Sequence, residues 1–108
     1  MDRNQPYYSL AKIKSLIQRG LYRISNAAFY GARLLGLNDE EAVVNVIVKL
    51  QGKDFYKSME SHRFSGTWQD VYRPLISGRM AYVKLQISAE KEAVIIQFKA
   101  KDFPNEGI

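Results

Sequence analysis

Two stretches in the C-terminal half place polar side chains at every second position, among them groups that can bind a phosphodiester and transfer protons. The stretches cover residues 80–87 and 93–99, and their polar members include Tyr82, Lys84, Gln97 and Lys99. In a β-strand this spacing places the side chains on one face. Lysine neutralises phosphate charge, and tyrosine can exchange a proton or stack on a base. The pattern predicts a cationic sheet face on which phosphate chemistry is possible.

A third stretch extends this face. Residues 68–73 are rich in aromatic and β-branched side chains, and they contribute Gln69 and Arg73 before Pro74 ends the run. The connections between the three stretches are short, so we expect an antiparallel meander. The opposite, apolar face is expected to carry Ala81, Val83, Leu85 and Ile87 in one strand, and Val94, Ile96 and Phe98 in the last strand, with Ile95 among the polar positions.

The N-terminal half has the spacing of helices. Apolar residues repeat at helical intervals in three segments that begin with capping residues, and these segments cover 9–19, 25–36 and 38–50. Residues 21–24 are expected to be an extended link. The predicted class is α+β, with N-terminal helices packed on one face of a C-terminal antiparallel β-sheet, and residues 1–108 are expected to form a single domain.

One further helical segment is expected after the third helix. Asp54 can cap a turn or two that carry Phe55 and Met59 on a common side. Lys57 would then point elsewhere.

The composition excludes several kinds of site. The 108 residues contain no cysteine and one histidine, His62, which excludes disulfides, thiolate or histidine-cluster metal sites and a catalytic histidine pair. Sixteen basic residues against eleven acidic ones give a net charge of +5, which permits a polyanionic partner such as nucleic acid. No apolar run approaches the ~18 residues of a membrane span, and residues 1–6 are too polar for a signal peptide. We expect a cytoplasmic protein with no membrane partner.

Ordinary structural roles must be weighed against this chemistry. A solvated sheet face commonly carries lysine, glutamine and tyrosine, and a single lysine or histidine such as Lys57 or His62 is usually a surface residue. Trp68 and Phe98 fit the core better than a base-stacking platform, and Asp70 fits a structural acceptor for a backbone or basic group. A noncatalytic nucleic-acid-binding module and a purely protein-binding component both remain alternatives to an enzyme.

Two motifs resemble the signature of the MqsR family of bacterial toxins. The first is DFYKSM at residues 54–59, and the second is WQDVYRP at 68–74. The runs MAYVKL at 80–85 and IIQFK at 95–99 are similar to the family's last two strands. The resemblance covers most of the chain and implies a RelE-like fold. It also implies the activity of a ribosome-independent messenger-RNA endoribonuclease from a type II toxin–antitoxin system.

The resemblance also implies particular residues and partners. Family members use four positions in the active site, and this chain has the same residue types there: Lys57, Gln69, Tyr82 and Lys99. Single-stranded mRNA with GCU-like sites is the implied substrate, without metal or other cofactor. The implied partner is an MqsA-type antitoxin with a zinc-binding region and a helix-turn-helix region. We further expect RNA or phosphate binding by Arg73, Lys84, His62 and Arg63, the last two from a loop beside the site.

A ribonuclease without a histidine pair needs other groups for proton transfer. The mechanism expected here is attack by the ribose 2′-hydroxyl, which gives a 2′,3′-cyclic phosphate and a 5′-hydroxyl. We expect Tyr82 and Lys57 to transfer protons, with either one as the base. Lys99 and Arg73 would hold the charge that develops on phosphate, and Gln69 would orient the RNA.

Overall fold

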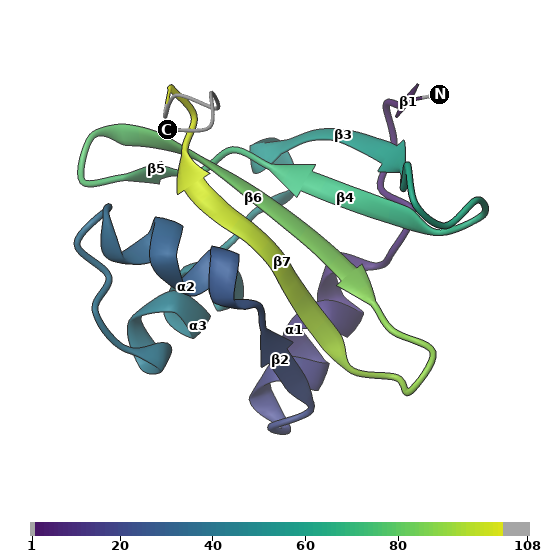
Figure 1. The fold of residues 1–108 in the computed structure, drawn as a ribbon, viewed down its shortest axis with the longest axis horizontal. Helices are drawn as coiled ribbons and strands as arrows, with labels where there is room; N and C mark the ends of the chain where they lie inside the picture. Colours follow the sequence, from purple (N-terminus) through teal and green to yellow (C-terminus); the bar gives the residue numbers. More distant parts are fainter. Residues whose placement is uncertain (1, 103–108) are drawn as a thin grey trace.

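Helices cover one face of a β-sheet in the computed structural model, which describes residues 2–102 (Figure 1). Over that range the helices are α1 (Leu10–Gln18), α2 (Asn26–Arg33) and α3 (Glu40–Val48), followed by a short 3-10 turn, Gly52–Asp54. Each α-helix begins at a side chain that accepts a hydrogen bond from the backbone N–H three residues later, and these caps are Ser9, Ser25 and Asp39. The α+β class and the three predicted helices are confirmed. Within residues 2–102, no helix is both long and apolar enough to cross a membrane.

The sheet is mixed and mostly antiparallel. Its strands are β1 (Asp2–Arg3), β2 (Tyr22–Ile24), β3 (Phe55–Glu60), β4 (Trp68–Tyr72), β5 (Leu75–Ile76), β6 (Arg79–Ile87) and β7 (Ala93–Ala100). They are ordered β1-β3-β4-β6-β7-β2, and β5 pairs with β6. The predicted meander of β4, β6 and β7 is confirmed by their antiparallel registers.

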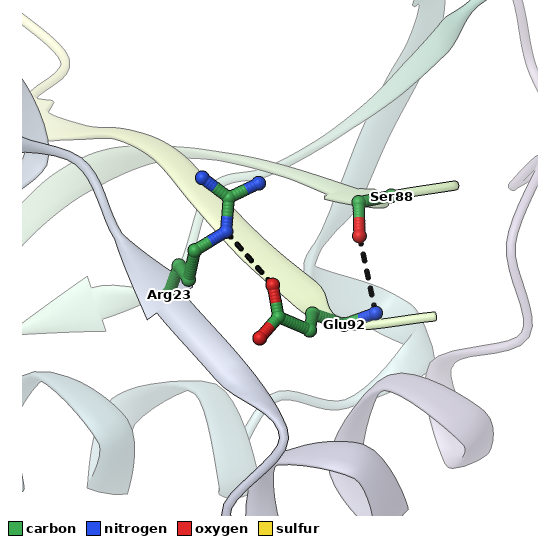
Figure 2. A network of polar contacts seen from close by, with 3 residues as sticks. All are labelled: Arg23, Ser88 and Glu92. Atoms are coloured by element: carbon green, nitrogen blue, oxygen red, sulfur yellow. Dashed lines mark hydrogen bonds and ion pairs between the residues drawn. The ribbon is translucent and has the colours of Figure 1, made fainter. Parts of the chain in front are cut away.

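The segment that we expected to be an extended link is a strand. Residues 22–24 form β2, which pairs with β7 in parallel and makes the sheet mixed. Figure 2 shows how β2 is tied to the β6–β7 turn: Arg23 Nε lies 2.9 Å from Glu92 Oε1, and the backbone N–H of Glu92 donates to Ser88 Oγ at 3.1 Å. These contacts join the N-terminal half to the edge of the sheet.

The helix predicted after Asp54 is wrong, because residues 55–60 form β3. Asp54 does cap a turn, but it closes the 3-10 turn by accepting a hydrogen bond from Gln51 N. Its carbonyl oxygen then accepts from Arg73 N at 2.7 Å, which aligns the following residues with β4. Pairing along the whole of β4 satisfies more backbone groups than one or two isolated helical turns would. Lys57 therefore lies on a strand.

The alternation predicted for the last strand is interrupted by a β-bulge. Ile95 pairs with Leu85, and Gln97 pairs with Lys84, so Ile96 is the extra residue. Ile95 and Phe98 are both fully buried, which corrects the predicted placement of Ile95 on the polar face and of Ile96 on the apolar face. Because of the bulge, Ile95 and Phe98 both enter the core, while Gln97 and Lys99 stay on the solvent-facing side of the sheet.

Helix α2 packs closely on β7 at this point. Ser25 N donates to the carbonyl of Ile95, and Ser25 Oγ donates to that of Ile96 at 2.7 Å. Further along the helix, a β-carbon on Gly31 would lie 1.8 Å from the carbonyl oxygen of Phe98. Glycine at this position allows the helix to approach the strand backbone, which explains a residue that disfavours helix on propensity alone.

Candidate active site

The solvent-facing side of the sheet gathers the polar residues that the sequence pointed to. On β6 the side chains of Ala81, Val83 and Leu85 are buried, so Tyr82 and Lys84 project from the other face. Directly paired residues of antiparallel strands share a face. Tyr82 pairs with Lys99, and Lys84 with Gln97, which places all four on what we call the cationic face.

Lys57 and Gln69 join this face through β3 and β4. Val71 pairs with Lys84 on one side and with Lys57 on the other, so the three residues lie in one row across the sheet. Gln69 is two residues from Val71, and its Nε2 lies 3.4 Å from Gln86 Oε1. The four positions implied by the family resemblance thus come from four neighbouring strands. The sequence pattern alone had placed Gln69, Tyr82 and Lys99 together, and the corrected β3 brings in Lys57.

Tyr82 is half-buried and has several charged side chains around it. Lys99 Nζ lies 5.4 Å from the centroid of its ring. Burial is the main influence on the phenol and raises its pKa above the usual 10.0. The positive charges of Lys57 and Arg73 act in the opposite direction, whereas Asp2 and Tyr56 reinforce the increase. At neutral pH the phenol therefore keeps its proton.

Lys84 is partly buried among the other lysines of this face, and its pKa is lowered. Burial lowers its pKa from the usual 10.5, and the neighbouring ammonium groups of Lys99 and Lys57 lower it further. The positive side chains gathered on the cationic face can attract a phosphate.

Two residues that the sequence analysis did not single out also belong to this region. Asp2 Oδ2, from β1, lies 3.3 Å from Lys57 Nζ. Tyr56 sits at a register irregularity between Phe55 and Lys57, and the guanidinium carbon of Arg73 lies 3.9 Å from its ring centroid. Tyr56 is part of the first family-like motif, but its exposure depends on the β-bulge, which the residue pattern does not reveal.

The loop carrying His62 and Arg63 lies at the end of the β3–β4 hairpin. Both residues are exposed, and the loop turns on Ser61 Oγ, which accepts a hydrogen bond from Arg63 N at 3.2 Å. Arg73 directly follows β4 and is five positions from Trp68, where the hairpin ends, which in extended chain is a distance of about 16 Å. The loop is thus next to Gln69 rather than to Tyr82 and Lys99.

Phe98 is in the core as expected, whereas Trp68 is only partly buried. The Trp68 ring stacks on Tyr7 at 5.8 Å between centroids, on the face opposite Gln69. Asp70 confirms its expected role as a structural acceptor. It is fully buried and accepts hydrogen bonds from the backbone N–H groups of Tyr7 and Tyr8 at 3.0 and 2.9 Å. These contacts hold the N-terminal segment against the sheet.

Metal ligands are not grouped in the part of the chain that the structure describes: residues 2–102 contain no cluster of three histidine, aspartate or glutamate side chains able to hold an ion. The functional groups on the cationic face are ammonium, guanidinium, phenol and amide. Fold and site together define a small α+β protein with a tyrosine surrounded by basic side chains on a rigid sheet.

Comparison with known proteins shows which family this chain matches. Residues 5–100 match the family described as "Motility quorum-sensing regulator, toxin of MqsA". The mRNA interferase toxin MqsR of Escherichia coli (strain K12) is 38% identical over 102 residues, which is 94% of this chain and 100% of that relative. The chain belongs to the MqsR toxin family.

Proposed function

We propose that this protein is an mRNA interferase, the toxin of a toxin–antitoxin pair, and that it cleaves single-stranded message on the cationic face. The observation that carries the proposal is the placement of Lys57, Tyr82 and Lys99 on one face of the sheet, in a chain whose E. coli relative is named an mRNA interferase. The proposed reaction needs no metal. In it, the ribose 2′-oxygen forms a bond to phosphorus, the bond to the 5′-oxygen breaks, and a 2′,3′-cyclic phosphate and a 5′-hydroxyl result.

Tyr82 is the proton donor in this proposal. The 5′-oxygen must be protonated as it leaves, and a phenol whose pKa is raised by burial holds a proton for that purpose at neutral pH. Residue types alone leave Tyr82 and Lys57 equally suited to act as the base. The raised pKa of the phenol supports the donor role.

Lys57 then accepts the proton of the 2′-hydroxyl. This step requires the neutral amine form of Lys57. Lys99 and Arg73 stabilise the charge on the pentavalent phosphorane, and Gln69 orients the RNA from the adjoining strand. Lys84 assists in binding phosphate, and His62 and Arg63 extend RNA binding beyond Gln69.

Mapping of 5′-ends on a defined RNA tests this function. Purified protein is incubated with RNA in excess chelator, alongside Lys57→Ala and Tyr82→Phe. Lys12→Ala is the matched control, because Lys12 is an exposed lysine on α1. We expect cuts by the wild type and by Lys12→Ala, and at least a roughly 100-fold loss of cleavage in the other two variants. RNA binding should be retained in Tyr82→Phe and should fall by no more than about fivefold in Lys57→Ala, which also removes a phosphate contact. RNA binding without cleavage would instead identify a noncatalytic module, and activity only after adding magnesium would refute the metal-free reaction.

The same cuts test the sequence preference. We propose GCU-like triplets, as the family resemblance implies. Cleavage spread without regard to sequence would contradict this choice.

The partner proposed for this toxin is an MqsA-type antitoxin, and the family's description as toxin of MqsA supports it. A protein of charge +5 attracts an acidic surface, which accelerates association. The antitoxin can bind either the cationic face or a sheet edge. We favour an edge, because β1 and β2 cover the two outer strands over only two and three residues. Co-expression should give a co-purifying complex, and hydrogen exchange should show protection in β2 or β3 rather than around Tyr82.

A further inference from the structure

A cavity opens beside the cationic face, between the N-terminal segment and β3. Its volume is ≈ 520 Å³, and it is lined by Asp2, Arg3, Asn4, Gln5, Tyr56 and Lys57. This volume falls within the range of small-molecule sites. Because Lys57 belongs both to the cavity and to the proposed active site, a nucleotide whose phosphate lies at Lys57 has the cavity within reach of its base.

One wall of the cavity is an aromatic ring prepared for stacking. Tyr56 is 46% exposed, and the Arg73 guanidinium 3.9 Å from its centroid holds the ring in place by a cation–π contact. Aromatic rings on single-stranded RNA-binding surfaces stack on bases of any identity. Lys57 Nζ lies further away, at 5.6 Å from the same centroid, so a tyrosine that is held by Arg73 still has exposed ring surface to offer a base.

The N-terminal segment contributes side chains to the same cavity that can distinguish bases. Asn4 and Gln5 are exposed, and each side-chain amide offers a donor and an acceptor to a base edge. The segment carrying them is held in place at both ends, by the pairing of Asp2 with Met59 and by the hydrogen bond from Tyr7 N to Asp70.

We propose that this cavity is a nucleobase-binding subsite, in which Tyr56 stacks on one base of a single-stranded RNA and the amides of Asn4 and Gln5 read its edge. The inference rests on the proposed ribonuclease function, because the two sites share Lys57. It assigns base selection to residues from the N-terminal segment and from the first family-like motif, and not to the loop of His62 and Arg63.

Binding to RNA that cannot be cut tests the subsite separately from catalysis. Short 2′-O-methyl RNAs lack the nucleophile, and each carries one abasic position in turn. We expect one abasic position to weaken wild-type binding about tenfold. Tyr56→Ala should bind the intact RNA about tenfold more weakly and lose nothing further at that abasic position, and Tyr56→Phe should bind as the wild type does. Tyr30→Ala is the matched control, because Tyr30 is 62% exposed on α2.

Base reading is tested with all four bases at the sensitive position. The double variant Asn4→Ala/Gln5→Ala should reduce the differences in affinity among the four bases there, while Gln18→Ala, which removes an exposed amide on α1, should leave them unchanged.

Equal affinities of Tyr56→Ala and Tyr30→Ala would overturn the subsite, as would a loss in Tyr56→Ala that is independent of every abasic position. If the effect of Tyr56→Ala is coupled to one abasic position but unmodified RNA stays intact, the subsite is supported and the ribonuclease proposal fails. Cleavage without the coupling would support the ribonuclease proposal and overturn the subsite.

Discussion

The ammonium nitrogen of Lys57 lies 3.3 Å from a carboxylate oxygen of Asp2, so a residue of the N-terminal segment balances part of the positive charge on the cationic face. The side chain of Asp2 is 55% exposed and that of Lys57 is 29% exposed, which allows water and salt to weaken the pair. A bound phosphate would compete with Asp2 for the same ammonium group.

Asp2→Asn should therefore strengthen RNA binding at low salt. Removing the carboxylate leaves Lys57 available to phosphate, and an exposed ion pair is worth up to about 1 kcal/mol, or about fivefold in affinity. Fluorescence anisotropy with uncleavable RNA measures the change, which should disappear at high salt. Asp102→Asn is the control, because Asp102 lies 3.7 Å from Lys101, is 94% exposed and changes the net charge equally. The same gain in both variants would contradict a local effect at Lys57.

The pH dependence of cleavage should have an alkaline limit above pH 10. Burial raises the pKa of Tyr82 above 10.0, so the proposed donor loses its proton only beyond that pH. Asp2 contributes to the increase, so Asp2→Asn should move the limit to lower pH and Asp102→Asn should not move it. We would measure kcat/KM on a DNA strand that carries a single ribonucleotide at the cleavage site. Such a strand has only one linkage that alkaline solvent can hydrolyse, which reduces the background. A wild-type alkaline limit well below pH 10 would exclude Tyr82 as the donor.

Gly31→Ala should destabilise the fold. A β-carbon 1.8 Å from the carbonyl oxygen of Phe98 forces α2 away from β7, at a cost of about 3 kcal/mol in the free energy of unfolding. This outweighs the ~1 kcal/mol that alanine gains in helix propensity. Gly52→Ala is the control, since a β-carbon there meets nothing within 4 Å. Denaturant unfolding of the two variants measures the difference, and equal stabilities would contradict the close approach.

Asp70→Asn should loosen the N-terminal segment. The two carboxylate oxygens each accept a backbone N–H, from Tyr7 and from Tyr8, whereas an amide offers one acceptor and turns a donor towards the other N–H. The free energy of unfolding should fall by about 1–3 kcal/mol. Hydrogen exchange should accelerate first at Tyr7 and Tyr8. Unchanged exchange at these two amides would show that Asp70 is not what holds the segment.

Alkaline pH should weaken the fold through Tyr72. Burial, with a smaller effect of Asp70, raises the pKa of Tyr72 to about 12. Between pH 10 and 12 the unfolded chain loses this proton while the folded chain keeps it, so stability is full below pH 10 and falls as the pH rises. Tyr72→Phe should reduce the slope of stability against pH by about 1.4 kcal/mol per unit in this window. An identical slope in wild type and variant would contradict the shift.

Much of the fold was predictable because its signals are local. Capping residues and helical spacing located the three helices. Alternation located the meander and the cationic face, including three of the four positions that the family resemblance implies. The segment after Asp54 misled because a capping residue followed by Phe55 and Met59 fits a helical turn. Its strand conformation comes from pairing with β4, which is a long-range contact that no local pattern records.

The bulge in β7 was hidden for a different reason. Ile95 and Ile96 are both apolar, so the alternation of buried and exposed residues is compatible with either of them facing the core. The choice depends on which phase fills the core beside Leu85 and still allows Phe98 to enter it. Tyr56 and Asp2 were missed in the same way, since their nearness to the site follows from strand register and not from residue type.

The alternation on β6 links the site to the core within one strand. Tyr82 stands between the buried residues Ala81 and Val83, so gaining or losing one residue would exchange the two faces. In cells that express this chain, in-frame insertion of a single codon within β6 should therefore relieve growth arrest as completely as substitution of Tyr82 does. The same insertion in the loop at 61–67 would leave the cells unable to grow.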